Sequence, residues 1–444
     1  MPRRPTEAPN RSDLALSVRL TRPAPQPSSL GRTLRGAVSA GFAAQVLIAI
    51  SGIIGARLLG PEDRGFLALL LIYPSVVAQV GSLGISLAIT HHIARTPAVA
   101  VPLLRSQLVP IALQVAVLTC VHALIVLEYS SGKPDDVKVA AVISLAAVPA
   151  TYLSHYGLAV LQGRREYRSL NVWRLAPPFG YVAGLLVLVA AGGGTLVELT
   201  AASVGSGLLA GALVVFVVAR RVYRERASDD ADKRVPAPPR GEIYRFGAAS
   251  YLGYVSPLDS FRLDQLFVGL VLGPVQLGLY VVAVAFMNLP RFVGQSLGLV
   301  AAPHLATLAG QDELRAAARR FVKTGVVACA AIAAGVGATL QWTLPFLFGE
   351  EYAGAIGTGR VLLLAAFFLG VRRIATDCAR GAGLPRLGAS AEIASLLSFA
   401  ATAPPLAFAW GVVGVAWALA IGSLTGCLAL TFTLRPWLRV RDLP

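Results

Sequence analysis

The stretch LLGPEDRGFLAL at residues 58–69 has a near copy, VLGPVQLGLYVV, at residues 271–282. The Gly-Pro pair at 60–61 returns at 273–274, and a glycine follows each proline four residues later. Glycine readily takes the left-handed conformation that ends a helix, and proline is favoured in the first turn of the next helix. Each copy therefore predicts a tight hairpin between two helices.

The helices joined by these hairpins are predicted to cross a membrane, because the chain is far less polar than a water-soluble domain. Hydrophobic residues make up 55% of the 444 residues and charged residues only 14%. A typical soluble protein carries about 25% charged residues. The charge-free runs 36–56, 199–219, 324–349 and 411–434 each reach the roughly 20 residues that cross a bilayer as a helix. The predicted fold class is an all-α integral membrane protein.

About twelve transmembrane helices can be placed, six on each side of a charged, Pro-rich segment. Because six is an even number, both hairpins have the same orientation, and an axis along the membrane normal relates the two halves. We expect two parallel-oriented six-helix bundles around a central cavity. The predicted spans are 37–57, 65–92, 103–127, 138–161, 172–191, 196–219, 243–272, 275–303, 322–345, 355–380, 387–409 and 412–434.

The charged segment between the halves cannot be buried in lipid and is interpreted as a flexible linker. The chain start is rich in Pro, Ser and Arg and is expected to be disordered. The expected parts are a basic cytoplasmic tail (1–36), an N-terminal six-helix lobe (37–219), a cytoplasmic linker (220–242), a C-terminal six-helix lobe (243–435) and a cytoplasmic tail (436–444).

Lys and Arg are distributed unequally between the two sides of the predicted membrane. The termini and the segments on their side hold most of the 39 Lys and Arg residues, and this side is usually cytoplasmic. Both termini are therefore predicted to face the cytoplasm. The same bias explains most of the formal net charge of +16, so anionic lipids are the expected partner and no nucleic acid is required.

Three stretches resemble known proteins: ARLLGPEDRGFLALLL (56–71), RLDQLFVGLVLGPVQLGLYVVAVAF (262–286) and FLFGEEYAGA (346–355). They are similar to the corresponding parts of bacterial polysaccharide flippases, the O-antigen and exopolysaccharide members of the multidrug/oligosaccharidyl-lipid/polysaccharide exporter superfamily. The resemblance extends over about residues 37–435.

This resemblance implies a multi-pass protein of the bacterial plasma membrane that acts in cell-surface polysaccharide biosynthesis. The implied activity is to move an undecaprenyl-pyrophosphate-linked oligosaccharide from the inner to the outer leaflet by alternating access. A polysaccharide polymerase and glycosyltransferases are the implied protein partners.

Ionisable residues inside the predicted spans indicate where such a cargo would bind, since they are costly in a membrane. They are concentrated in the second half of the chain. Arginine suits a pyrophosphate because its guanidinium donates two parallel hydrogen bonds to phosphate oxygens. The predicted pyrophosphate ligands are Arg291, Arg372, Arg373 and Arg262.

Acidic residues in the same spans leave a second interpretation open. Asp259 lies three residues before Arg262, and Arg373 lies four residues before Asp377, so each pair can form within one helix. Ligand binding and structural pairing remain equally supported for these arginines. The candidates for ion coupling or structural pairing are Asp264, Asp259, Asp377 and Glu392, and the polar cavity candidate of the first span is Gln45.

Other classes of protein are less well supported. Proton-coupled drug exporters of the same superfamily are expected to carry an acid in the first span, where this chain has only Gln45. Lipid II flippases are expected to have two further spans. A membrane polymerase or ligase is disfavoured because the longest outer loops have only about ten residues. We expect no enzyme activity, cofactor or metal site. The alternative functions are a drug or ion antiporter of the same superfamily and a lipid II-type flippase.

Overall fold

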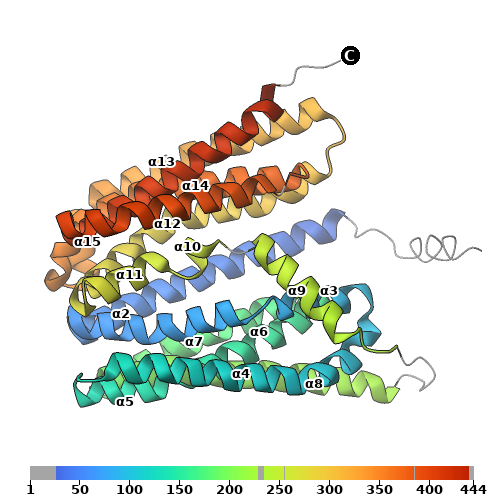
Figure 1. Cartoon of the computed structure of the whole chain (residues 1–444), viewed down its shortest axis with the longest axis horizontal. Coiled ribbons are helices and arrows are strands. Elements are labelled where there is room, and N and C mark those ends of the chain that lie inside the picture. The colour runs from blue at the N-terminus through green and yellow to red at the C-terminus, as the bar shows by residue number, and fades with distance from the viewer. Residues whose placement is uncertain (1–26, 229–234, 255, 385, 440–444) are drawn as a thin grey trace, which may run out of the picture.

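The computed structural model describes residues 27–228, 235–254, 256–384 and 386–439, and this part of the chain consists of helices and short turns (Figure 1). The helices of the first half are α2 (Pro27–Gly81), α3 (Ile85–Arg95), η1 (Pro97–Val99), α4 (Ala100–Ser130), α5 (Asp135–Ser144), α6 (Ala147–Gly163), α7 (Tyr167–Ala190) and α8 (Leu196–Ser228). Those of the second half are α9 (Arg240–Tyr254), α10 (Pro257–Ser260), α11 (Leu263–Val271), α12 (Pro274–Ala306), α13 (Gln311–Phe348), η2 (Glu350–Ala355), α14 (Ile356–Gly381) and α15 (Arg386–Arg439).

Within the described residues, nine helical stretches are long and apolar enough to cross a membrane. Two of them, Gly36–Gly81 and Leu387–Leu434, have 46 and 48 residues, about twice the length of one crossing. Figure 1 shows that α2 and α15 each fold back on themselves. The chain reverses at Gly60 in α2 and at Gly411 in α15, both with positive φ. The predicted all-α membrane fold is confirmed.

Two helical groups make up the molecule, with α2–α8 on one side and α12–α15 on the other (Figure 1). Helices α9, α10 and α11 lie between them. The α2 turn and α11 lie at the left in Figure 1, and we call this the hairpin end. The C-terminal ends of α8 and α15 lie toward the opposite end, which we call the terminal end.

Three predicted spans are interrupted, although the sequence suggested continuous helices. The spans 65–92, 138–161 and 243–272 break at residues 82–84, at 145–146 and around Arg262. At the first break, a Cβ on Gly84 would overlap the carbonyl group of Gly247. This close approach lets α3 pack directly on α9. The break coincides with positive φ at Leu83 and Gly84 and with this long-range packing, and local hydropathy carries no sign of it.

Three expected boundaries also need correction. Helix α2 already begins at Pro27, where proline fits the first turn of a helix, so the expected disordered tail does not include residues 27–36. Helix α8 continues to Ser228 and α9 begins at Arg240, which shortens the expected linker at both ends. Helix α15 likewise runs on to Arg439. Residues 1–26, 229–234 and 440–444 lie outside the described part.

The two copies of the repeated sequence have the same backbone conformation and contact each other. Gly60 has φ 68° and ψ 174°, and Gly273 has φ 88° and ψ 175°. The sequence predicted a left-handed cap, but this extended ψ at positive φ belongs to a region that is essentially restricted to glycine. A Cβ on Gly65 would overlap the carbonyl group of Pro274, and a Cβ on Gly278 would overlap that of Pro61. We call this reciprocal packing the hairpin contact.

A second connection at the hairpin end involves the stretch FLFGEEYAGA. The Tyr352 hydroxyl donates a hydrogen bond to the Ala56 carbonyl oxygen at 3.1 Å, and both residues are buried. Arg57 Nε donates to the Leu347 carbonyl oxygen at 2.7 Å, and its Nη2 donates to Phe346. These bonds connect α2 to the turn after α13, so three points join the two halves of the chain here.

Candidate functional site

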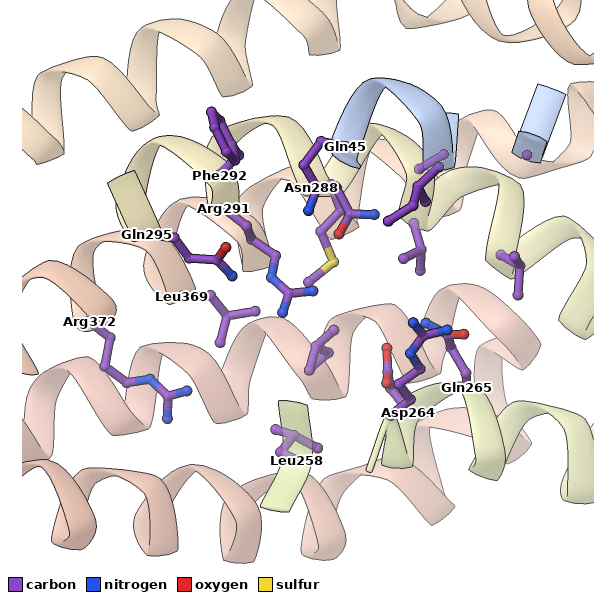
Figure 2. Close-up of a pocket in the computed structure, with 18 of the residues that line it drawn as sticks. Gln45, Leu258, Asp264, Gln265, Asn288, Arg291, Phe292, Gln295, Leu369 and Arg372 are labelled. Carbon is purple, nitrogen blue, oxygen red and sulfur yellow. The ribbon is translucent and has the colours of Figure 1, made fainter. Parts of the chain in front are cut away.

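A cavity of about 310 Å³ lies between the two helical groups (Figure 2). Its walls come from α2 in the first half and from α10, α11, α12, α14 and α15 in the second half. Part of the wall is apolar, including Leu258, Met287 and Leu369. The polar residues that line it are Gln45, Arg64, Arg262, Asp264, Gln265, Asn288, Arg291, Gln295 and Arg372.

Five of the predicted site residues are brought together in this cavity although they are far apart in the sequence: Gln45, Arg262, Asp264, Arg291 and Arg372. In Figure 2, Arg291 projects from α12 into the centre of the view. Arg372 approaches from α14, and Asp264 lies at the opposite side. The first and second halves of the chain therefore both contribute to one polar chamber.

Helix α12 provides the longest polar stripe of the cavity. Asn288, Arg291 and Gln295 are separated by three and four residues, so they share one face of the helix. Phe292 lies next to this stripe and also lines the cavity. Its ring packs against that of Phe42 on α2, with a centroid distance of 5.8 Å and an interplanar angle of 54°.

The break in the seventh predicted span places Arg262 and Asp264 in the cavity. Arg262 has φ 48° and occupies the position just before α11, a conformation that costs about 1–2 kcal/mol for a residue with a side chain. Asp264 is 7% exposed and accepts a hydrogen bond from the Tyr280 hydroxyl at 2.9 Å. Strained backbone of this kind occurs preferentially at functional sites.

Arg372 is shared between the cavity and an ion pair. Its Nη1 lies 3.0 Å from Glu392 Oε2, and its side chain is 4% exposed. The Ser256 hydroxyl also donates a hydrogen bond to Glu392. Glu392 is not among the residues that line the cavity. This cluster links α14 and α15 to the residue that precedes α10, and it neutralises the charge of Arg372 in part.

Arg373 and Asp377 lie outside the cavity lining. Arg373 Nε lies 3.0 Å from Asp377 Oδ2, and Arg380 Nη1 lies 2.8 Å from Asp377 Oδ1. The predicted intrahelical pair therefore forms, with Arg380 as a further member. This geometry favours the structural interpretation of Arg373 over a ligand role. The side chain of Asp259 lies outside the described part of the structure.

Sequence reasoning missed Arg64, which it assigned to an outer loop. Arg64 lines the cavity because the second part of α2 begins directly after the Gly60 turn. Its Nε is buried and has no hydrogen-bond partner within the described residues. The amides of Asn288, Gln295 and Gln265 were also missed, since only charged groups were considered within the second-half spans. Their spacing along one helix face was the available signal for α12.

No group of three or more His, Cys, Asp or Glu side chains that could hold a metal ion occurs within the described ranges. The polar groups of the cavity are guanidinium groups, amides and one carboxylate. Guanidinium groups bind anions, whereas amides can both donate and accept hydrogen bonds. The arrangement is therefore suited to an anionic, hydrogen-bonding ligand.

Two bundles around a polar chamber define a class of protein, the transporters and flippases of the multidrug/oligosaccharidyl-lipid/polysaccharide exporter superfamily. Residues 54–357 match the family model described as "Polysaccharide biosynthesis protein". This match covers more than half of the chain, so the protein belongs to this family of polysaccharide flippases. A search among curated protein sequences finds no match.

Solved structures with a similar fold are transporters of the same superfamily. An inward-facing multidrug resistance MATE family transporter superimposes with a TM-score of 0.71 at 14% identity, covering 89% of this chain and 94% of that chain. The lipid II flippase MurJ, in an inward closed conformation, gives 0.68 at 13% identity, covering 89% and 86%. A superfamily transporter from Pyrococcus furiosus, described as having a binding pocket of reverse polarity, gives 0.64 at 16% identity, covering 92% and 94%.

Proposed function

We propose that the protein is a flippase for an undecaprenyl-pyrophosphate-linked oligosaccharide, which it moves from the cytoplasmic to the outer leaflet of the plasma membrane. The observation that carries this proposal is the charge of the cavity. Its described lining contains four arginines and one carboxylate, Asp264. A lipid-linked pyrophosphate brings two negatively charged phosphate groups to such a chamber, and the family match to polysaccharide biosynthesis supports a saccharide cargo.

Within this proposal Arg291 is the main pyrophosphate ligand. It extends from the middle of α12 into the cavity (Figure 2), and its guanidinium can form paired hydrogen bonds with phosphate oxygens. Arg64 adds positive charge from α2, and Arg262 adds it from the position just before α11. Arg372 contributes less, because Glu392 already lies 3.0 Å from its Nη1.

The hairpin contact supports a direction of entry. It joins the two halves at the hairpin end through close backbone packing at Gly65 and Gly278. We infer that cargo enters the cavity from the terminal end, which we expect to face the cytoplasm because Lys and Arg are concentrated on that side. Transport then requires a second state, with the hairpin contact separated, that binds cargo with a different affinity.

Among the alternatives, export of cationic drugs is disfavoured by the four cavity arginines, because like charges repel inside a site of low dielectric constant. A lipid II-type cargo shares the prenyl pyrophosphate and differs in its sugar. Comparing the translocation rates of lipid II and of the undecaprenyl-pyrophosphate-linked oligosaccharide in the same vesicles distinguishes the two cargoes.

The proposal is tested with the full-length chain reconstituted into vesicles that contain undecaprenyl-pyrophosphate-linked oligosaccharide. Cargo on the outer surface is measured by its accessibility to a soluble lectin. We expect Arg291→Gln to slow translocation about ten- to a hundredfold, the loss expected for a hydrogen bond to a charged group. Arg373→Gln is the matched control, since Arg373 lies outside the cavity lining. Equal rates for both variants and the unsubstituted chain would contradict the proposal.

A further inference from the structure

Three amide side chains surround Arg291 in the cavity and are not used by the proposed pyrophosphate contacts. Figure 2 shows Gln45 and Asn288 on one side of Arg291 and Gln295 with Phe292 on the other. Two of the amides come from α12, and the third comes from the facing helix α2. We call this set the amide face: Gln45, Asn288, Phe292 and Gln295.

The amides of this face have unused hydrogen-bonding capacity. Within the described residues, Gln45, Asn288 and Gln295 form no hydrogen bond with another protein group. Each amide offers two donors and one acceptor oxygen. In a membrane interior such groups need a partner, because leaving a polar group unsatisfied away from water is costly. Cavity water or a bound ligand must therefore satisfy them.

The chemistry of these amides indicates the kind of ligand. A chamber built only for an anion would need donors alone, and the arginines already supply them. An amide can donate to one oxygen of a sugar and accept from a hydroxyl group of the same sugar. The aromatic ring of Phe292 adds an apolar surface of the type that binds the C–H face of a sugar ring. Apart from Arg291, the surrounding stripe of α12 carries no charged residue between positions 285 and 297.

We propose that the amide face binds the uncharged, hydroxylated sugar residue that is attached directly to the pyrophosphate. This inference rests on the proposed function and deepens it, because Arg291 lies within the same stripe as Asn288 and Gln295. The pyrophosphate at Arg291 places the first sugar over the neighbouring turns of α12. The arginines then retain the lipid carrier and the amide face selects its first sugar.

The test compares binding of bare and glycosylated lipids to the full-length chain in lipid nanodiscs. The probes are undecaprenyl pyrophosphate and the same lipid carrying one glucose, galactose or N-acetylglucosamine residue. We expect the unsubstituted chain to bind at least one glycosylated probe more tightly than the bare lipid. Asn288→Leu and Gln295→Leu should each weaken binding of the preferred glycosylated probe about three- to tenfold, the value of one neutral hydrogen bond. Both variants should bind the bare lipid as tightly as the unsubstituted chain does.

Gln341→Leu provides the matched control, because Gln341 is an amide on α13 that bonds to Arg360 outside the cavity. This variant should bind every probe as the unsubstituted chain does. The amide face would be overturned if Asn288→Leu and Gln295→Leu lost equal affinity for bare and glycosylated lipids. It would also be overturned if neither variant lost affinity for any probe. If the unsubstituted chain prefers no glycosylated probe, the sugar site is refuted and the flippase proposal stands. If it binds no pyrophosphate lipid, the flippase proposal itself fails.

Discussion

At the scale of single residues, the cavity combines charges that are held in place by different means. Asp264 is fixed by the Tyr280 hydroxyl, and Arg372 is fixed by Glu392. Arg262 is fixed by an unusual backbone conformation before α11. Asp264 and Arg372 are buried ionic groups with such partners and are expensive to disturb, so their removal should change stability as well as transport.

The hydrogen bond between Tyr280 and Asp264 should be measurable. Tyr280→Phe removes the donor and keeps the ring, and we expect the free energy of unfolding to fall by about 1.5–3 kcal/mol, the value for a bond to a charged group. Thermal unfolding of the purified protein in detergent measures this change. In the double variant with Asp264→Ala the two losses should not add, because both substitutions remove the same bond. If the losses in unfolding free energy of the two single variants add up strictly in the double variant, the bond contributes nothing to stability.

The buried pair of Arg372 and Glu392 leads to a prediction with a rescue. Glu392→Ala leaves the 4% exposed guanidinium of Arg372 without its carboxylate, and removal of one partner of a buried pair typically costs about 3–5 kcal/mol. Adding Arg372→Met should recover most of this loss, since the uncompensated charge disappears. Denaturation curves for the two single variants and the double variant are the measurement. A double variant less stable than Glu392→Ala would refute the pairing.

At the scale of the elements, the repeated Gly-Pro hairpins can be tested by adding a single methyl group. Gly65→Ala and Gly278→Ala would each drive a Cβ into a proline carbonyl of the other hairpin, and such overpacking costs typically about 1–3 kcal/mol. We expect the two hairpins to separate more often. A cysteine introduced at Ile48 in the cavity should then react faster with a membrane-impermeant thiol reagent added at the hairpin end.

The control for this experiment is Gly335→Ala on α13, where a new Cβ would meet nothing within 4 Å. This variant should leave the thiol reaction rate unchanged. Unchanged rates for Gly65→Ala and Gly278→Ala as well would show that the hairpin contact does not limit access from this end.

The sequence predicted the elements well wherever local chemistry decides them. Long apolar runs defined the crossings, and the Gly-Pro pairs at 60–61 and 273–274 defined two reversals. The interruptions at residues 82–84 and at Arg262 were missed. The first depends on the approach of Gly84 to Gly247, which are distant in the sequence. The long-range contact is absent from hydropathy, whereas the positive φ of Gly84 is a local glycine signal that was not used.

For the site, the sequence identified five of the cavity residues because charges and amides are rare in apolar spans. It could not separate Arg372 from its neighbour Arg373, which does not line the cavity and pairs with Asp377 instead. Helix rotation decides that difference, and rotation depends on packing against α12 and α15. Arg64 was missed because the predicted second span began at residue 65 and left Arg64 in a loop, whereas the helix already resumes directly after Gly60.

At the scale of the whole molecule, orientation in the membrane is the most direct prediction. Both termini should be cytoplasmic, because the side that retains Lys and Arg is usually the cytoplasmic one. Alkaline phosphatase, which is active only outside the cytoplasm, should be inactive when fused after residue 444. It should be active when inserted at Gly132, which lies in the turn between α4 and α5. The reverse pattern of activities would invert the proposed direction of transport.

The hairpin contact has a further consequence for the origin of the molecule. In each hairpin, the proline carbonyl group packs against the glycine of the other hairpin, and the glycine packs against the other hairpin's proline carbonyl. A single six-helix half therefore has a self-complementary surface, the kind that forms two-fold homodimers. Two identical halves would meet through the same packing that now joins two different ones. The present chain has the form expected when such a dimer is fused by gene duplication, and its two copies now differ beside the shared glycines, with Glu62, Asp63 and Arg64 in the first hairpin only.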